Sequence, residues 1–235
     1  MAVNQFGQPV GRLVPGWSAR ARPRPGVLAG EHVRLEPLAD RHVGDLFAQT
    51  CGPGREPLWT YLPIGPFDTA RTHAAALAAL VGDPSLVPLA IVPSTTGGAV
   101  GMASYLRIEP AAGCLEVGWV LFGPRLARTG AATEAMYLMA RHAFDDLGYR
   151  RVEWKCDALN QPSRSAAVRL GFRPEGTFRQ ASVVKGRNRD TAWYAMTDDD
   201  WRVLAPVYAD WLNRGQEGAG ALSELTRRAL ARVAR

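Results

Sequence analysis

The chain of 235 residues lacks the features that define several common protein classes. Its only cysteines, Cys51, Cys114 and Cys156, lie far apart and form no CxxC pair, so we expect neither a disulfide framework nor a metal site. No apolar run approaches the roughly 18 residues that span a bilayer. Residues 1–30 hold no apolar core of a secretory signal. We therefore expect a cytoplasmic protein without a membrane partner.

Lysine is almost missing, although the chain carries a net charge of +6. Of the 28 basic residues, only Lys155 and Lys185 are lysines. Positive charge gathers in residues 1–30 and 150–189, and the rest of the chain is acidic on balance. A basic segment is typical of nucleic-acid binding, but arginines also suit a small polyphosphorylated ligand. The GxGxxG fingerprint and the P-loop motif are absent, which argues against those nucleotide-binding folds.

The composition is that of a folded protein, with 47% hydrophobic and 21% charged residues. Residues 1–30 contain prolines and arginines without a hydrophobic period, and we predict an extended leader there. Residues 31–213 form the predicted domain. Residues 214–235 combine a glycine-containing linker at 215–220 with a short helix at 222–233. We see no internal repeat.

Hydrophobic periodicity predicts alternating strands and helices along the domain. Strands are expected at 33–38, 86–92, 99–107, 114–122, 152–156, 172–178, 181–184 and 191–196. Helices are expected near 40–47, at 70–81, 131–147 and 160–170, and from a cap at Asp198 to Trp211. Hairpin-joined strands precede a strand–helix–strand–helix section. This order favours an α/β protein of the α+β type, with a mixed sheet and helices on both faces.

Two strand-to-helix junctions have the composition of a binding site. At the first, strand 114–122 leads through Arg125 and Arg128 to the small residues Gly130, Ala131 and Ala132. Unpaired N–H groups and the helix dipole at such a start attract phosphate. At the second junction, Asn160 and Ser163 begin a helix, and Gly171-Phe172 follows it. Taken one at a time, these residues are equally consistent with ordinary helix ends.

The order and spacing of these motifs resemble the GNAT superfamily of N-acetyltransferases. The set comprises Arg128-Thr-Gly-Ala-Ala, Asn160-x-x-Ser163, Arg169-Leu-Gly-Phe172, Glu116-Val-Gly, and the segment from Lys185 to Asp190. It is most similar to the RimJ/RimL branch of ribosomal-protein-alanine acetyltransferases, over residues 31–200. The resemblance implies a GNAT-like fold, in which a splayed, mostly antiparallel sheet flanked by helices binds acetyl-CoA between its fourth and fifth strands.

The resemblance also implies which residues hold the co-substrate acetyl-CoA. The N–H groups of residues 128–132 would cradle the pyrophosphate, and strand residues 117–121 would bind the pantetheine arm as an added strand. The expected contacts are Val117, Trp119, Val120, Leu121, Arg125, Arg128, Thr129, Gly130, Ala131, Ala132, Asn160 and Ser163. Two positions depart from the family pattern. Ala127 replaces a Gln or Arg, and Ala167 replaces a frequent tyrosine general acid.

Acetyl transfer to an amine requires a base and benefits from an acid near the leaving thiolate. Glu116 is the first candidate base, because burial in an apolar strand would raise its pKa. Glu153, Asp157 and a water molecule remain alternatives. Ser163 matches the residue near the thioester sulfur in the RimJ/RimL branch and is the candidate acid. For the acceptor pocket we predict Trp59, Tyr61 and Tyr105.

The predicted function is thus N-acetylation of a primary amine, either a protein N-terminus or a small molecule. Two alternatives remain open: a catalytically weak acyl-CoA-binding regulatory module, and a basic protein associated with ribosomes or nucleic acid. Few aromatic residues accompany the basic ones in 150–189, so we do not expect a nucleic-acid partner. A homodimer is left open by the sequence.

Overall fold

The computed structural model describes residues 2–24, 26–214 and 219–233. Within them, one mixed sheet has the strand order β3-β4-β5-β6-β7-β8-β10-β9, antiparallel except between β7 and β8. Its strands are β3 (Leu28–Ala29), β4 (Val33–Pro37), β5 (Val87–Pro93), β6 (Gly101–Glu109), β7 (Cys114–Phe122), β8 (Arg151–Asp157), β9 (Arg173–Val184) and β10 (Arg187–Thr197). The predicted fold class, a mixed and mostly antiparallel sheet flanked by helices, is confirmed.

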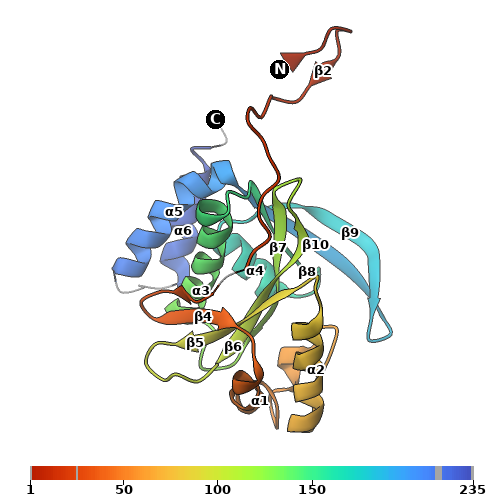
Figure 1. Cartoon of the computed structure of the whole chain (residues 1–235), viewed down its shortest axis with the longest axis vertical. Helices are drawn as coiled ribbons and strands as arrows, with labels where there is room; N and C mark the ends of the chain where they lie inside the picture. Colours follow the sequence, from red (N-terminus) through yellow and green to blue (C-terminus); the bar gives the residue numbers. More distant parts are fainter. Residues whose placement is uncertain (1, 25, 215–218, 234–235) are drawn as a thin grey trace.

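Helices cover both faces of the sheet (Figure 1). They are α1 (Val43–Thr50), α2 (Ala70–Gly82), α3 (Gly130–Arg141), α4 (Gln161–Arg169), α5 (Asp198–Asn213) and α6 (Ala219–Leu230), with short turns η1 (Asp40–His42), η2 (Glu56–Trp59) and the π-helical η3 (His142–Asp146). None of the helices in the described part of the chain is long and apolar enough to cross a membrane.

Alternating side chains on the strands divide the core into two parts. On β5, Leu89 and Ile91 pack toward α3 to α6, whereas Ala90 and Val92 pack toward α1 and α2. This follows from the period of two in a strand buried on both faces, which also explains its continuous apolar sequence.

Several predicted boundaries shift in the structure. The two strands expected at 172–178 and 181–184 are one strand, β9, which is irregular near Gln180. The cap of α5 is Thr197, not Asp198: the Thr197 hydroxyl accepts the N–H of Asp200, whose carboxylate accepts the N–H of Thr197. Most of the predicted linker at 215–220 lies outside the described residues. Helix α6 is an integral part of the core, with Leu222 fully buried.

The described residues of the leader contact the body at several points. A small hairpin, β1 (Ala2–Val3) with β2 (Pro9–Val10), projects away from the sheet (Figure 1). The Trp17 indole then donates to the carbonyl of Ala111 at 2.9 Å, and strand β3 joins the sheet beside β4. The buried carboxylate of Glu134 on α3 accepts three backbone N–H groups, from residues 31–33. Gly30 allows this approach, since a Cβ there would lie 2.6 Å from that carboxylate.

Candidate active site

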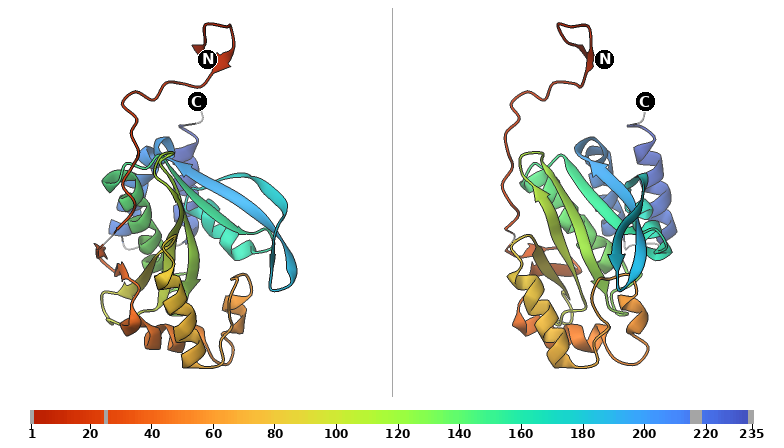
Figure 2. Two further views of the ribbon diagram at one scale, coloured as in Figure 1. Left: turned by 45° about the vertical axis from the view of Figure 1, so that its right-hand side comes forward. Right: turned by 90° about the vertical axis from the view of Figure 1, so that its right-hand side faces the viewer.

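The sheet opens between β7 and β8. These parallel strands pair at only three positions, from Cys114 with Arg151 to Glu116 with Glu153. Beyond Glu116, the edge of β7 that faces β8 has no strand partner within the described chain. The half of the sheet containing β9 and β10 diverges from the half containing β7 (Figure 2). Unpaired backbone groups at such an edge can bind an extended ligand.

A β-bulge in β7 accompanies this opening. Gly118 pairs with Ser104 and Leu121 pairs with Met102, so Trp119 and Val120 lie opposite the single residue Ala103. Trp119 takes a left-handed backbone conformation with φ of 51°, which is costly for a residue with a bulky side chain. Bulges bend a strand and redirect its side chains, and both bulged residues line the cavity described next.

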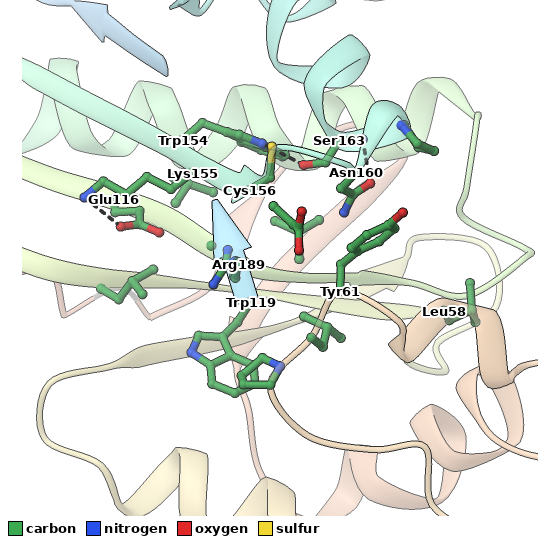
Figure 3. Close-up of a pocket in the computed structure, with 18 of the residues that line it drawn as sticks. Leu58, Tyr61, Glu116, Trp119, Trp154, Lys155, Cys156, Asn160, Ser163 and Arg189 are labelled. Atoms are coloured by element: carbon green, nitrogen blue, oxygen red, sulfur yellow. Dashed lines mark hydrogen bonds and ion pairs between the residues drawn. The ribbon is translucent and has the colours of Figure 1, made fainter. Parts of the chain in front are cut away.

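The opening contains a cavity of about 390 Å³. Its walls come from β7, β8, the start of α4, residue 189 of β10, and the loop at 57–63. Figure 3 shows the polar side chains that point into it. The charged and polar residues of the lining are Glu116, Lys155, Asp157, Asn160, Ser163 and Arg189.

A buried ion network occupies one wall of the cavity. The Nζ of Lys155 lies 3.1 Å from the Oε2 atom of Glu116 and 2.7 Å from the Oε2 atom of Glu153. Arg107 contacts the same Glu116 oxygen at 3.1 Å, and Arg151 contacts Glu153 at 2.8 Å. Burial raises the pKa of Glu116 above its ordinary value, and the cations Lys155 and Arg107 only partly oppose that rise. Glu116 is thus a carboxyl in the cavity whose pKa is shifted toward that of a useful base.

The other two candidate bases are held differently. Burial alone would raise the pKa of Glu153, but its interactions with Lys155 and Arg151 outweigh burial, and the net shift is downward. Glu153 also does not line the cavity. Asp157 does line it, but one of its carboxylate oxygens accepts the N–H of Leu159 at 2.8 Å. The geometry favours Glu116.

Asn160 and Ser163 lie together at the start of α4. The side-chain amide oxygen of Asn160 caps the helix by accepting the backbone N–H of Ser163 at 3.1 Å. The Ser163 hydroxyl oxygen accepts a hydrogen bond from the Trp154 indole at 3.0 Å, which leaves its own proton available as a donor. Both side chains line the cavity. The cap explains why the helix begins here, and the Ser163 hydroxyl also lies within hydrogen-bond reach of the Cys156 thiol in the same cavity.

At the predicted phosphate cradle, fewer N–H groups are free of protein acceptors than the sequence suggested. The N–H of Thr129 donates to Leu126, and the N–H of Ala132 donates to the Thr129 hydroxyl that caps α3. Both donors are therefore engaged. Gly130 and Ala131, as the first two helical residues, keep N–H groups without intrahelical acceptors. Arg128 precedes them in a left-handed conformation with φ of 64°.

Arg125 and two of the predicted acceptor residues lie elsewhere. Arg125 lines a separate depression beside α1. Trp59 is 1% exposed and donates to the carbonyl of Thr50, and Tyr105 is fully buried and donates to the carbonyl of Met139 on α3. Both aromatic side chains are core residues, so we no longer place them in the pocket. Tyr61 does line the cavity, and its hydroxyl donates to the carbonyl of Leu159 across the opening.

Sequence reasoning missed Lys155, Arg189, Trp154 and Cys156 as cavity residues. One indication was present: Lys155 is one of only two lysines and stands between apolar neighbours in a strand. Because residues two apart on a strand share a face, Lys155 lies on the same face of β8 as Glu153, and Trp154 points to the opposite face. Among the described residues, no group of three or more His, Cys, Asp or Glu side chains could hold a metal ion.

The splayed sheet, the bulged strand and the open cavity at the start of α4 suit an enzyme that transfers an acyl group from an extended carrier. The model of the acetyltransferase (GNAT) domain matches residues 32–173. The chain therefore belongs to the GNAT family of acetyltransferases, and the resemblance predicted from its motifs is confirmed.

Individual relatives agree with this assignment. The fold is similar to a GCN5-related N-acetyltransferase from Brucella melitensis, with a TM-score of 0.86 and 38% identity over 91% of this chain and 100% of that one. A probable GNAT-family acetyltransferase from Chromobacterium violaceum has a TM-score of 0.78 and 39% sequence identity, covering 83% of this chain and 97% of that one. The ribosomal-protein-serine acetyltransferase of Escherichia coli is 30% identical over 43% of this chain and 55% of that protein.

Proposed function

We propose that this acetyltransferase transfers the acetyl group of acetyl-CoA to a primary amine by direct attack in a ternary complex. The supporting observation is that one cavity joins the unpaired edge of β7, the start of α4 and the buried carboxyl of Glu116. The fit to acetyl-CoA is chemical. An extended pantetheine arm carries amides that suit a free strand edge, and the start of α3 beside Arg128 suits a pyrophosphate.

In this proposal the residues mainly position the reactants. Backbone N–H groups of the bulge near Val120 and Leu121 polarise the thioester carbonyl. Glu116, directly or through a water molecule, accepts the proton that the ammonium must lose before it attacks. The nitrogen then bonds to the acetyl carbon, and the carbon–sulfur bond breaks. The departing thiolate takes up a proton through the Ser163 hydroxyl, which regains one from the acylated nitrogen as that nitrogen loses its second proton. Because a thiolate leaves readily, we expect this acid to contribute less than the base.

The test combines binding with turnover. Acetyl-CoA at millimolar concentration should raise the melting temperature, and thiol release should accelerate with some members of a panel of amines and N-terminal peptides. Glu116→Gln should lower kcat by about 10²–10⁴-fold, and Ser163→Ala by a smaller factor. Asp157→Asn is the matched control, because it removes another carboxylate of the same cavity.

The outcomes separate the candidate functions. Absence of stabilisation by acetyl-CoA would overturn the proposal. Stabilisation without turnover on any acceptor would favour the acyl-CoA-binding module instead. Equal loss of kcat in Glu116→Gln and Asp157→Asn, without loss of folding, would remove the distinction between the two carboxylates.

A further inference from the structure

Arg189 is the one charged side chain of the cavity lining for which the described residues supply no hydrogen bond or ion pair. The other three have partners: Glu116 contacts Lys155 and Arg107, Lys155 contacts two glutamates, and Asp157 accepts a backbone N–H. The side chain of Arg189 is half-buried, and its buried Nε has no hydrogen-bond partner within the described part of the chain. A buried guanidinium donor left unpaired costs free energy, so its presence needs an explanation.

The position of Arg189 is fixed by the strand that carries it. Thr191 of β10 pairs with Asp157 of β8, and Arg189 lies two residues further toward the hairpin. Positions two apart on a strand share a face. Arg189 therefore shares a face with Trp193, whose ring lies 3.6 Å from the Nζ of Lys155. Figure 3 shows Arg189 between Trp119 and Cys156, inside the cavity.

The surrounding residues favour an anion that enters with the acceptor. Arginine presents donors in a planar fork that matches a carboxylate. Two hydrogen bonds join the loop at 57–63 to neighbouring segments: the Tyr61 hydroxyl donates to the carbonyl of Leu159, and the Nζ of Lys185 donates to the carbonyl of Trp59. Tyr61 and Arg189 line the same cavity, so an acceptor bound beside this loop can place its anion at the guanidinium.

We infer that Arg189 is a specificity-determining residue, and that the preferred acceptor is a primary amine bearing a carboxylate several bonds from its nitrogen. This inference rests on the proposed acetyl transfer to an amine. The spacing follows from the sheet. Glu153 pairs beside Glu116, Asp157 lies four residues along β8, about 13 Å away, and Arg189 lies two residues beyond Thr191, the partner of Asp157. Side chains reaching from the two levels leave room for a spacer between the amine and the anion.

Two sources supply this chemistry: a small amino acid, or an N-terminal peptide with an acidic side chain. For the first, thiol release would be measured for ω-amino acids of increasing length, each compared with the alkylamine of equal length. For the second, a serine-initiated peptide amide with glutamate at its second position would be compared with the same peptide containing glutamine. In the preferred source, the carboxylate should raise kcat/KM by about 10- to 100-fold.

The variants assign that preference to one side chain. Arg189→Gln should collapse the ratio of the two kcat/KM values toward one, and Arg189→Lys should restore part of it. Arg187→Gln is the matched control, because Arg187 lies on the same strand and is exposed outside the cavity lining. It should keep the wild-type ratio.

Three results would overturn the inference while leaving acetyl transfer intact. One is turnover of amines with no carboxylate preference in either source. Another is a preference that survives Arg189→Gln. The third is an Arg189→Gln variant that raises the KM for acetyl-CoA and keeps the ratio, which would assign the guanidinium to the co-substrate. Failure of the proposed function itself looks different, because then no amine is acetylated and acetyl-CoA does not stabilise the protein.

Discussion

Replacing Lys155 by methionine tests the buried ion network most directly. The side chain of Lys155 is 6% exposed and lies between two carboxylates. Methionine keeps most of the apolar stem and removes only the ammonium group. Glu116 then retains Arg107, and Glu153 retains Arg151. Neither carboxylate is left entirely unpaired, although Arg107 is 64% exposed and its attraction is weakened by water.

The expected loss of stability follows from these contacts. Breaking a buried pair by removing one partner costs about 3–5 kcal/mol, and the remaining arginines reduce that cost. Loss of the contact between the ammonium group and the Trp193 ring adds about 0.5–2 kcal/mol. We therefore expect Lys155→Met to lower the free energy of unfolding by about 2–4 kcal/mol near neutral pH.

The loss should depend on pH with a definite sign. The pKa of Glu116 is already raised by burial, and removing a cation raises it further. A carboxyl whose pKa is higher in the folded state stabilises the fold at low pH, and this contribution disappears as the pH rises through the folded-state pKa. Glu153, whose pKa is lowered in the wild type by the same lysine, loses stabilisation above its unfolded pKa. Both effects make the loss of unfolding free energy in Lys155→Met, measured against the wild type, larger at higher pH.

Urea unfolding at pH 5 and pH 8 measures this difference. Arg202→Met is the matched control, since Arg202 pairs with Asp199 at 2.7 Å but is 68% exposed, and we expect a change within about 1 kcal/mol. The acid limb of the kcat/KM profile should also move to higher pH in Lys155→Met, because Glu116 must be ionised to accept a proton. A loss of stability that is equal at both pH values, or larger at pH 5, would refute the reasoning.

Three further predictions concern other parts of the molecule. Ala131→Asp places a carboxylate at the start of α3, where it suits the helix dipole but repels a pyrophosphate. The KM for acetyl-CoA should rise about tenfold while that for S-acetyl-pantetheine stays constant, and an equal rise for both would contradict the cradle. Tyr208→Phe removes a buried hydroxyl that donates to the Leu170 carbonyl at 2.6 Å. It should cost about 1 kcal/mol in urea unfolding, and no loss would mean that this bond contributes nothing net. Trp17→Ala removes the indole held by the Ala111 carbonyl and flanked by Arg20 and Arg150. Trypsin should then cleave faster after Arg20, which precedes Ala21, with kcat unchanged; an unaltered cleavage rate would show that other contacts hold the leader.

The local pattern of the sequence determined most of the elements that position the site. Strand 114–122 was predicted with the bounds that β7 has, because apolar alternation and flanking turns are local features. The small residues at 130–132 and the capping residue Asn160 likewise predicted the starts of two helices, α3 and α4. The motifs added the family, because their order and spacing are also properties of the sequence alone.

The ends of some elements depended on contacts that the sequence does not display. Thr197 begins α5 because its hydroxyl and the Asp200 carboxylate bond reciprocally, whereas the sequence predicted Asp198 as the cap. The sequence predicted an extended leader without showing where it attaches. In the structure it contributes β3, and its Trp17 indole donates to the carbonyl of Ala111, 94 residues along the chain.

Which side chains face the cavity was decided only by tertiary structure. Trp59, Tyr61 and Tyr105 were all predicted for the acceptor pocket. Of these three aromatic residues, Tyr61 lines the cavity, whereas Trp59 and Tyr105 are buried in the core. The basic residues at 150–189 gave a net charge that first suggested a nucleic acid. Several of them pair internally instead, as Arg151 does with Glu175 and Arg173 with Asp200. The direction of a side chain depends on strand register and on bulges, which arise from pairing between distant segments. The sequence therefore determined the family and the elements of the site, and the packing of the sheet decided that Lys155 is paired and that the Arg189 side chain has no partner among the residues described.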